Sequence, residues 1–355
     1  MQYILVTGSA GFIGSNFISH WLSCEPSTVV SLDKLTYAGN LTNLASIRRS
    51  GRHIFIKGDI RDQQLVSKLL KTYRPAALIN FAAETHVDRS IVGAEHFVET
   101  NVGGTFHLLE TIRLHACMLV GEFRFVQIST DEVYGSLPPE SPGFSENSPF
   151  APNNPYAASK ASADLLARSF LQTYNVPVIT TRCSNNYGPR QFVEKLIPRT
   201  IQNARAGLPI PVYGDGRNVR DWLYVIDHCE AIRRIVKRGR VGEIYNIGGE
   251  CEKSNLVVVE ELCALLAKLQ PGPDYGSFIR FVPDRPGHDR RYAMCIDKIR
   301  CELEWSPTES FSSGLRKTVE WYLTNTSVDE RAISRAIGGK VDTDTAARNP
   351  DAPVM

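Results

Sequence analysis

The sequence predicts an α/β fold, with a Rossmann-type, doubly wound parallel sheet of about seven strands and a smaller, discontinuous α+β domain. Short apolar runs alternate with longer segments of helical spacing, which is the pattern of a parallel sheet covered by helices on both faces. A glycine-rich turn follows the first apolar run and opens the first helical segment. The alternation breaks down in two later segments, which indicates a second domain.

The expected strands are short apolar runs, and helical segments lie between most of them. The strands are Tyr3–Thr7, Val29–Leu32, His53–Lys57, Ala77–Phe81, Phe123–Ser129, Val178–Arg182 and Glu243–Ile247. The helical segments include Phe12–Ser23, Gln63–Lys71, Ala94–Leu114 and Ala157–Tyr174.

Glycines, prolines and long polar connections interrupt this pattern after Tyr187. We therefore assign residues 1–187 and 222–251 to a dinucleotide-binding sheet domain. Residues 188–221 and 252–325 are assigned to a smaller second domain. Residues 326–355 lack an apolar stripe, so we expect a loosely ordered tail.

The composition excludes several classes of protein. A formal net charge of +2 without a dominant basic block argues against binding to nucleic acid or to an anionic membrane. No apolar stretch has the length of a membrane span and no basic, apolar leader precedes the first strand, so we expect a cytoplasmic protein. The eight cysteines are scattered without metal-site spacing, which favours free thiols and no metal.

The turn Thr7-Gly8-Ser9-Ala10-Gly11-Phe12-Ile13-Gly14 suits a dinucleotide. Gly8 permits the tight turn, Gly11 lets the backbone approach a pyrophosphate, and Gly14 lets the helix pack against the strand. The phosphates would then lie at the positive end of the helix. The spacing G-x-x-G-x-x-G is typical of short-chain dehydrogenase-like folds, and ordinary turn glycines are the alternative.

Asp33 ends the second strand about 20 residues further on, where a carboxylate bonds a ribose 2′-hydroxyl. A carboxylate at this place repels a 2′-phosphate, so the sequence favours NAD over NADP. Lys34 beside it carries a positive charge, which does not fit this preference for NAD. Asp59 and Ile60 follow the third strand, and we expect them to flank the adenine ring.

Tyr156 and Lys160 lie four residues apart, on one face of an expected helix. A phenol titrates near pH 10, so its pKa must fall by about 3, roughly 4 kcal/mol, before it is a base near pH 7. The Lys160 ammonium and a cationic nicotinamide ring are the expected sources of this effect. A solvated helix that carries both residues by chance is the alternative.

Ser129-Thr130-Asp131-Glu132 ends the fifth expected strand and argues against chance. Adjacent carboxylates repel each other and are costly to desolvate, so they suit structural roles poorly. They suit proton transfer if their surroundings keep one protonated and the other ionised. Helix capping by Asp131 is the alternative.

These chemically distinctive residues share one position relative to the sheet. Ligands of open parallel sheets bind at the carboxyl ends of the strands, so the coincidence over six strands predicts one site. The residues that follow successive strands are Gly8, Asp33, Asp59, Ala83-Glu84, Thr130-Asp131-Glu132 and Asn185.

With these motifs the chain resembles the extended short-chain dehydrogenases/reductases and, within them, closely resembles the dTDP-glucose 4,6-dehydratases. The resemblance spans about residues 2–325. Its segments are Thr7–Ser15, Leu32–Asn40 (LDKLTYAGN), Phe81–Ser90, Thr100–Thr105, Ser129–Gly135 (STDEVYG), Tyr156–Lys160, Cys183–Pro189, Glu194–Pro198, Arg220–Val225, Tyr245–Gly249, Asp284–Tyr292 (DRPGHDRRY) and Thr318–Leu323.

The resemblance implies an enzyme that converts dTDP-glucose to its 4-keto-6-deoxy derivative and water, the first step toward deoxysugars such as rhamnose. Tyr156, held by Lys160, would take the proton of the sugar 4-hydroxyl, to which Thr130 would bond. Glu132 would remove the C5 proton, and Asp131 would protonate the leaving C6 hydroxyl. The resemblance also implies a tightly held NAD that is regenerated in each cycle, and a homodimer formed through the two long helical segments.

The resemblance further implies two sets of binding residues. The NAD set is Gly8, Gly11, Phe12, Ile13, Gly14, Asp33, Lys34, Leu35, Thr36, Asp59, Ile60, Ala82, Ala83, Thr100, Tyr156, Lys160 and Asn186. The nucleotide-sugar set is His86, Thr130, Asn185, Lys195, Leu196, Pro211, Val212, Tyr213, Arg220, Asn255, Arg285 and His288. Arg220 and Arg285 would clamp the diphosphate with forked donors, and residues 211–213 would line the base. Purely structural roles are the alternative for Arg220, His288 and His86.

The chain departs from the family pattern at Ser9, Arg190 and Cys251, and we expect Arg190 to add charge near the substrate entrance. A sugar-nucleotide 4-epimerase would share the NAD site but has no use for Asp131 and Glu132. A non-catalytic NAD-binding protein would not need Tyr156 and Lys160. Thymine rests on resemblance alone and differs from uracil by one methyl, worth about 0.8 kcal/mol when buried, so UDP-glucose is an alternative substrate.

Overall fold

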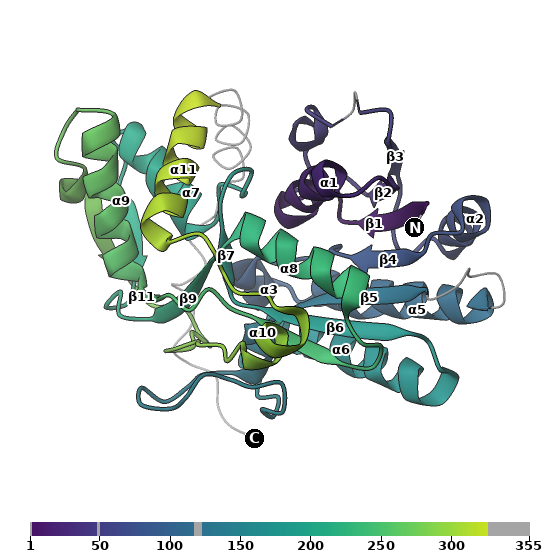
Figure 1. Cartoon of the computed structure of the whole chain (residues 1–355). Helices are drawn as coiled ribbons and strands as arrows, with labels where there is room; N and C mark the ends of the chain where they lie inside the picture. The colour runs from purple at the N-terminus through teal and green to yellow at the C-terminus, as the bar shows by residue number, and fades with distance from the viewer. Residues whose placement is uncertain (1, 48–49, 117–122, 326–355) are drawn as a thin grey trace, which may run out of the picture.

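A computed structural model describes residues 2–47, 50–116 and 123–325 of the chain (Figure 1). The tail that we predicted to be loosely ordered, residues 326–355, lies outside the described residues. Among the helices that are described, none combines the length and the apolar character needed to span a membrane.

A seven-stranded parallel sheet forms the centre of the larger lobe, as predicted. Its strands are β1 (Tyr3–Thr7), β2 (Thr28–Asp33), β3 (His53–Lys57), β4 (Ala77–Asn80), β5 (Arg124–Thr130), β6 (Val178–Cys183) and β10 (Ile244–Ile247). They lie in the order β10-β6-β5-β4-β1-β2-β3, and all pair in parallel. The chain order reverses between β1 and β4, which makes the carboxyl ends of these strands the expected ligand site.

Helices cover both faces of this sheet, which explains why its strands, apart from the edge strand β3, are buried at nearly every position (Figure 1). Ile4 and Val6 of β1 pack into one core cluster with α1 (Phe12–Cys24) and α8 (Val225–Arg238). Leu5 between them packs into a cluster on the other face. The helices of that face are α2 (Gln63–Tyr73), α5 (Thr105–Leu114) and α6 (Pro155–Tyr174).

The expected helix 94–114 is interrupted in the structure. A short α4 (Glu95–Phe97) leads into a π-helix, η2 (Val98–Gly104), before α5 begins. A Cβ on Gly104 would lie 2.4 Å from Cδ1 of Ile60, so the wide turn packs closely against the loop after β3. π-helical turns are frequent at functional sites, and this one carries Thr100.

A smaller lobe packs beside the carboxyl ends of the sheet strands. It contains the parallel pair β8 (Ile210–Tyr213) and β12 (Ile279–Val282), and the sheet β11-β9-β7, made by Glu252–Ser254, Val219–Tyr224 and Asn185–Tyr187. Its helices are α7 (Leu196–Arg205), α9 (Asn255–Leu269) and α11 (Phe311–Thr324). These elements share a second core cluster that includes Tyr187 and Trp222.

The boundaries between the two predicted domains stay a prediction. The core clusters nevertheless show one segment that returns to the larger lobe. Residues 292–305, which include α10 (Asp297–Leu303), contribute Tyr292, Met294 and Trp305 to the core around α1 and α8. Two further short helices, α3 (Val87–Val92) and the 3-10 helix η1 (Leu41–Leu44), follow β4 and β2.

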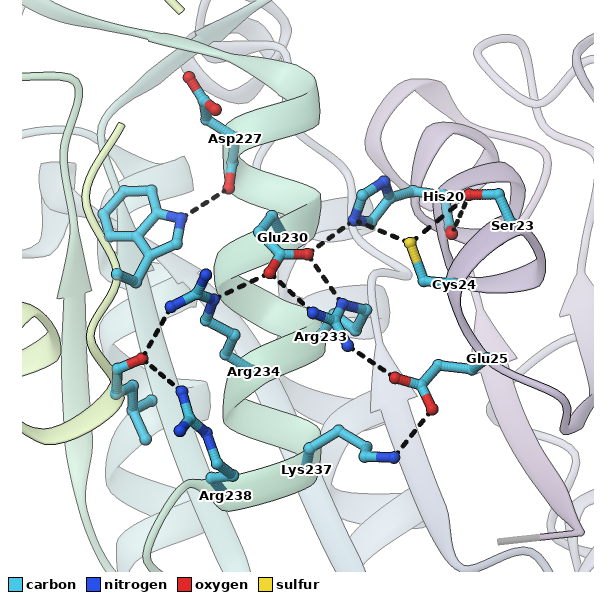
Figure 2. Close-up of polar contacts among 12 residues, drawn as sticks. His20, Ser23, Cys24, Glu25, Asp227, Glu230, Arg233, Arg234, Lys237 and Arg238 are labelled. Carbon is cyan, nitrogen blue, oxygen red and sulfur yellow. Dashed lines mark hydrogen bonds and ion pairs between the residues drawn. The ribbon is translucent and has the colours of Figure 1, made fainter. Parts of the chain in front are cut away.

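Buried and half-buried charges join α8 to α1 on the face of the sheet that they share (Figure 2). Glu230 of α8 contacts Nε2 of His20 in α1 at 2.9 Å and accepts from Arg233 and Arg234. Burial alone would raise the pKa of Glu230, but the hydrogen bonds from His20, Arg233 and Arg234 hold the pKa of this carboxyl well below its usual range. Arg234 also donates to the Leu303 carbonyl at the end of α10.

We predict that Glu230→Gln lowers the free energy of unfolding by about 1–2 kcal/mol, because three partners lose a charged acceptor. The lowered pKa means that this stabilisation is complete above about pH 4.3, the usual value for glutamate, and is lost as the pH falls further. Urea unfolding of both proteins at pH 7 and pH 3 measures the difference. Glu304→Gln, at an exposed pair with Arg238, is the control and should cost less than about 0.5 kcal/mol. If Glu230→Gln and the unmodified protein differed in free energy of unfolding by the same amount at pH 7 and at pH 3, the prediction would be contradicted.

Candidate active site

The turn between β1 and α1 requires glycine at two predicted positions. Gly8 has a φ of +63°, and a Cβ on it would lie 2.6 Å from the backbone nitrogen of Ala82. A Cβ on Gly14 would lie 2.3 Å from the carbonyl oxygen of Gly8. Gly11 is the N-cap of α1 and provides no side-chain cap, so the first N–H groups of the helix suit an anion.

A cavity lies where β1, β2, β3 and β4 end, and most of the predicted cofactor residues line it. These are Gly8, Gly11, Asp33, Lys34, Thr36, Asp59, Ile60, Ala82, Ala83 and Thr100. Glu84, predicted at this edge of the sheet but not in the cofactor set, also lines it. Five more lining residues were not predicted from the sequence: Leu32, Ala38, Gly39, Gly58 and Phe81. The structure therefore brings together segments that are dispersed over the first 100 residues of the chain.

The remaining predicted cofactor residues do not line this cavity. Phe12 and Ile13 begin α1 and pack against the first core, as does Leu35, whose φ is +60°. The Asn186 side chain is engaged within the protein, with its Oδ1 2.9 Å from Nδ1 of His228. Any contact of these residues with a cofactor remains a prediction.

The structure resolves the discordance between Asp33 and Lys34. Asp33 accepts from the backbone N–H of Ala10 at 2.8 Å and of Leu35 at 2.7 Å, which fixes its carboxylate at the edge of the cavity. The Lys34 ammonium lies 2.9 Å from Oδ2 of Asp59. Because that pair compensates the lysine charge, Asp33 provides the uncompensated charge at this position.

The Thr130-Asp131-Glu132 segment forms the start of a 3-10 helix, η4 (Asp131–Tyr134), at the end of β5. Thr130 is its N-cap and accepts from the backbone N–H of Glu132 at 3.3 Å, so the capping role that we considered for Asp131 belongs to Thr130. The Thr130 hydroxyl also donates to Oδ1 of Asp131 at 3.1 Å. Oε2 of Glu132 accepts from the Asn154 side chain at 3.3 Å.

The two adjacent carboxyls occupy different environments. Asp131 is 2% exposed, and among the described residues its buried Oδ2 has no hydrogen-bond partner. Burial, together with the charges of Glu132 and Asp221, raises the pKa of Asp131 well above its usual value. The side chain of Glu132 is only partly buried. A protonated Asp131 beside a more accessible carboxyl suits acid–base chemistry.

Tyr156 and Lys160 both lie on the buried face of α6, and the joint effect of the lysine and a nicotinamide ring on the phenol stays a prediction. The Lys160 ammonium donates to the Ile128 carbonyl at 2.6 Å. Burial raises the pKa of Tyr156 well above its usual value, and the charge of Glu132 adds to the increase, whereas a hydrogen bond with the Thr130 side chain opposes it. The Lys160 ammonium is directed at the backbone of β5, and the net effect of the protein without ligands is to raise the pKa of the phenol.

Three cationic side chains of the predicted substrate set gather near η4. Arg220 is 4% exposed, lies 4.4 Å over the Tyr292 ring, and donates to the Asp289 carbonyl at 3.0 Å. Lys195 donates to the Thr85 carbonyl at 2.8 Å. Burial lowers the pKa of both Lys195 and Arg220. The charge of the Glu132 carboxylate raises both pKa values, whereas the charge of the Arg285 guanidinium lowers them.

Arg285 is the third of these cations, and two histidines lie beside the three. Arg285 donates to Oδ1 of Asp88 at 3.1 Å, and Oδ2 of the same carboxylate accepts from Tyr213 at 3.1 Å. His288 Nδ1 lies 2.6 Å from Asp284. His86 Nε2 lies 3.4 Å from Glu194, and burial lowers the pKa of His86 to about 4. A site with this many donors and neutral imidazoles suits an anionic ligand such as a diphosphate.

Strand β8 presents only part of its predicted base-binding surface. Pro211 and Tyr213 are half-buried on one side of the strand, whereas the Val212 side chain packs into the second core cluster. Leu196 and Asn255 begin α7 and α9. The last predicted substrate residue, Asn185 in β7, has a buried Oδ1 without a hydrogen-bond partner among the described residues.

Arg190, which we expected to add charge near the substrate entrance, contacts the larger lobe. Its backbone turns with a φ of +71°, and its guanidinium donates to the Ser15 carbonyl of α1 at 3.0 Å and contacts Ser46. Arg190 therefore joins the loop after β7 to the larger lobe, and an effect of its charge on the substrate stays a prediction. Ser9 is buried, and the backbone N–H of Cys251 donates to Asp221.

Several site residues were missed in the sequence analysis. Asn154 caps α6 by accepting from the backbone N–H of Ala157 at 2.8 Å, and the sequence Asn154-Pro155 is a recognisable helix start. Asn101 donates to the Glu84 carbonyl at 3.0 Å and to Ser159 at 2.8 Å, which ties the π-helix to α6. No local signal in the sequence predicts this contact.

Comparisons with known proteins agree with this geometry. Residues 5–318 match the model of a family described as GDP-mannose 4,6-dehydratase. The dTDP-glucose 4,6-dehydratase of Xanthomonas campestris pv. campestris is 55% identical over 328 residues, which cover 90% of this chain and 93% of that protein.

Solved structures also show similarity to a dTDP-glucose 4,6-dehydratase. The dTDP-glucose 4,6-dehydratase from Bacillus anthracis, determined in complex with NAD, has a TM-score of 0.84 at 46% identity and covers 94% of this chain and 100% of its own. The UDP-glucuronic acid 4-epimerase from Bacillus cereus, in complex with UDP-glucuronic acid and NAD, has a TM-score of 0.81 at 28% identity, with 91% and 99% covered. The shared fold therefore does not separate the two reactions, and the side chains must.

Proposed function

The chain belongs to this 4,6-dehydratase family, together with the dTDP-glucose 4,6-dehydratases that it resembles, and we propose that it converts dTDP-glucose to dTDP-4-keto-6-deoxyglucose and water. The observation that carries this proposal is the pair Asp131-Glu132 at the carboxyl end of β5, beside Tyr156 and the cationic side chains. An epimerase moves one hydrogen at C4 and needs no second acid–base pair, whereas a dehydratase must also remove a C5 proton and a C6 hydroxyl.

The residues at the carboxyl edge fit NAD. The turn around Gly8 and Gly14 leaves no room for side chains, so the backbone N–H groups at the start of α1 are open to a pyrophosphate. Asp33 retains free lone pairs after accepting two backbone N–H groups and can accept from ribose hydroxyls. When bound, NAD would supply the oxidising power, as acceptor of a hydride from C4 and donor of that hydride to C6.

Tyr156 and Thr130 act in the oxidation step of the proposed mechanism. The phenolate oxygen of Tyr156 takes the proton of the 4-hydroxyl while the C4 hydride leaves, and the Thr130 hydroxyl bonds the same oxygen. The protein raises the pKa of Tyr156 through burial, so the phenolate needs a cation that arrives with the ligands, and the nicotinamide ring is one. Lys160 holds α6 against β5 through the Ile128 carbonyl.

Asp131 and Glu132 act in the elimination step. The ketone at C4 acidifies the C5 hydrogen, which Glu132 removes as a proton. Asp131, whose raised pKa favours its protonated form, gives its proton to the C6 hydroxyl, which leaves as water while the C5–C6 double bond forms. Return of the hydride to C6 is matched by return of the proton from Glu132 to C5, so the ring keeps its 4-ketone and Glu132 is again ionised. Tyr156 then still holds the proton of the 4-hydroxyl and Asp131 still lacks one. Transfer of that proton from Tyr156 to Asp131, directly or through water, restores both groups.

We place the nucleotide end of the substrate on the smaller lobe. Lys195, Arg220 and Arg285 would compensate the diphosphate, and Pro211 and Tyr213 would contact the base. This arrangement brings the sugar to η4, because the Glu132 carboxylate lies near enough to Lys195 and Arg220 for its charge to raise the pKa of both. UDP-glucose carries the same sugar and diphosphate, so it is the natural competitor in any test of the base.

Product analysis tests the proposed function. Purified protein is incubated with dTDP-glucose or UDP-glucose, and the products are identified by mass spectrometry and NMR. The proposal expects a keto sugar lighter than the substrate by one water, formed faster from dTDP-glucose. A product of unchanged mass with the configuration of galactose would instead identify an epimerase.

A homodimer is also part of the proposal. Large apolar side chains are exposed along α3, η2, α5 and α6, among them Val92 at 92%, Val98 at 54% and Leu165 at 53%. Phe106, Leu114 and Tyr174 add to this surface. Exposed apolar side chains gathered on adjacent helices mark an interaction surface, and self-association through these helices would cover it.

We predict that Leu165→Asp converts a dimer into a monomer, because a carboxylate would have to be buried in an apolar contact. Light scattering after size-exclusion chromatography measures the molar mass of the variant and of the unmodified protein. Leu208→Asp, a substitution at a similarly exposed leucine outside these helices, is the control and should leave the mass unchanged. An unmodified protein with the mass of one chain would contradict the proposal.

A further inference from the structure

Asp289 lies at the junction between the predicted diphosphate ligands and the predicted catalytic residues. It belongs to the loop between β12 and α10, which also carries Arg285 and His288. Its side chain is 4% exposed. A buried carboxylate is costly unless it is hydrogen-bonded, so its partners indicate what it holds in place.

On one side, Asp289 holds the segment that precedes α6. Its Oδ1 accepts from the side-chain nitrogen of Asn153 at 2.6 Å. The next residue, Asn154, caps α6 through the backbone N–H of Ala157 at 2.8 Å and donates to Oε2 of Glu132 at 3.3 Å. Asn153 and Asn154 therefore connect Asp289 to the start of the helix that carries Tyr156 and to the proposed C5 base.

The backbone of the same loop also touches this segment. Gly287 has a φ of +65°, and a Cβ on it would lie 2.4 Å from the Asn153 carbonyl oxygen. Arg290, which follows Asp289, donates its backbone N–H to the Ser136 hydroxyl at 2.9 Å, just beyond η4. The loop thus packs against both segments that place Glu132.

On the other side, Asp289 holds the diphosphate ligands. Its Oδ2 accepts from the Tyr292 hydroxyl at 2.5 Å, and the Arg220 guanidinium lies over the ring of that tyrosine. Its carbonyl oxygen accepts from Arg220 at 3.0 Å and from the Asn218 side chain at 3.1 Å. Asp289 therefore connects Arg220 and this loop to Asn153.

We propose that Asp289 is a positioning residue that couples the site of the nucleotide diphosphate to the placement of Glu132 for removal of the C5 proton. The inference rests on the proposed function, since it assumes that the elimination step occurs. A purely structural loop contact would affect binding and both chemical steps alike. Coupling through Asn153 and Asn154 instead affects the step in which Glu132 acts.

The test compares Asn153→Ala and Asp289→Ala with the unmodified protein in a single turnover of dTDP-glucose. The reaction is quenched at intervals, and mass spectrometry quantifies the 4-keto-glucose and the 4-keto-6-deoxyglucose nucleotides. We expect elimination to slow by between about 10- and 100-fold, the size of effect that a displacement of about 1 Å produces. C4 oxidation and the affinity for dTDP, measured by calorimetry with Asn153→Ala, should change by less than about twofold.

Three further variants make this comparison specific. Asp289→Asn should restore elimination, because an amide oxygen can accept from Asn153 while its nitrogen donates to the Tyr292 oxygen. The double variant Asn153→Ala/Asp289→Ala should be no slower than the slower single variant, as expected for one shared link. Asp215→Asn breaks a half-exposed ion pair with Arg290 in the same loop and should leave elimination unchanged.

Elimination at the unmodified rate in Asn153→Ala would overturn the inference, as would equal slowing of both steps. Asn153→Ala leaves the bonds of Asp289 to Tyr292 and Arg220 in place, so it decides the question if Asp289→Ala does not fold. An unmodified protein that forms neither keto nucleotide would overturn the proposed function, and the inference with it. Normal turnover by the unmodified protein with normal elimination in Asn153→Ala would overturn the inference alone.

Discussion

Glu132→Gln is expected to oxidise C4 of dTDP-glucose and then stop, so that the 4-keto-glucose nucleotide accumulates and water is not lost. The amide keeps the size of the side chain, but it cannot accept the C5 proton. General base catalysis contributes about 10²–10⁴-fold, and formation of the 4-keto-6-deoxy product should fall by this factor. Quenched single turnovers followed by mass spectrometry separate the two nucleotides.

Glu140→Gln is the matched control for this experiment. It makes the same change at an exposed glutamate eight residues further along the chain and should leave both steps unchanged. If Glu132→Gln formed the normal product at an undiminished rate, another group would have to remove the C5 proton. If it failed to oxidise C4, Glu132 would instead support the step that we assign to Tyr156.

Tyr156→Phe is expected to lower turnover by several orders of magnitude, because no group would remain to take the proton of the 4-hydroxyl. Unlike Glu132→Gln, this variant should accumulate no keto nucleotide. Binding of the nucleotide sugar should persist, since Lys195, Arg220 and Arg285 are unchanged. Calorimetry with dTDP measures binding, and product formation from dTDP-glucose measures turnover.

Tyr174→Phe removes a hydroxyl from the exposed end of the same helix and should turn over normally. A rate for Tyr156→Phe within a few-fold of the unmodified protein would exclude Tyr156 as the base.

The buried position of Tyr156 makes a second expectation possible. Because the protein raises the pKa of Tyr156, the phenol should remain protonated near neutral pH in the protein without ligands.

The features that the sequence predicted correctly are those determined by local patterns. The seven sheet strands follow from apolar runs, and the glycine turn follows from the backbone conformation at Gly8 and the close packing of Gly14. The convergence of Asp33, Asp59 and Asp131 at one edge needs only the parallel order of the strands.

The features that it could not predict depend on contacts between distant residues. The direction of the Lys160 ammonium toward Ile128, and the pairing of Lys34 with Asp59, require the folded positions of neighbouring strands. The contact of Arg190 with the Ser15 carbonyl of α1 likewise joins residues that are 175 positions apart. The π-helix before α5 has no signature in its apolar spacing.

The connection of two loops through Asp289 also depends on contacts between distant residues. Asn153 and Asp289 are 136 residues apart, and each has an ordinary loop context in the sequence. Only the structure shows that the loop with the predicted diphosphate ligands also supports the cap of α6 and the contact of Asn154 with Glu132. Resemblance identified the individual residues of this loop, but it did not indicate that the two groups are connected.

The most direct test of the account follows the hydrogen at C4. Purified protein is incubated with dTDP-glucose that carries deuterium at C4, and NMR locates the label in the product. The account predicts deuterium at C6 of a 4-keto-6-deoxy sugar, since one hydride leaves C4 and returns to C6 within the same cycle. Deuterium that remained at C4 of a galactose nucleotide would contradict it and would identify an epimerase on the same fold.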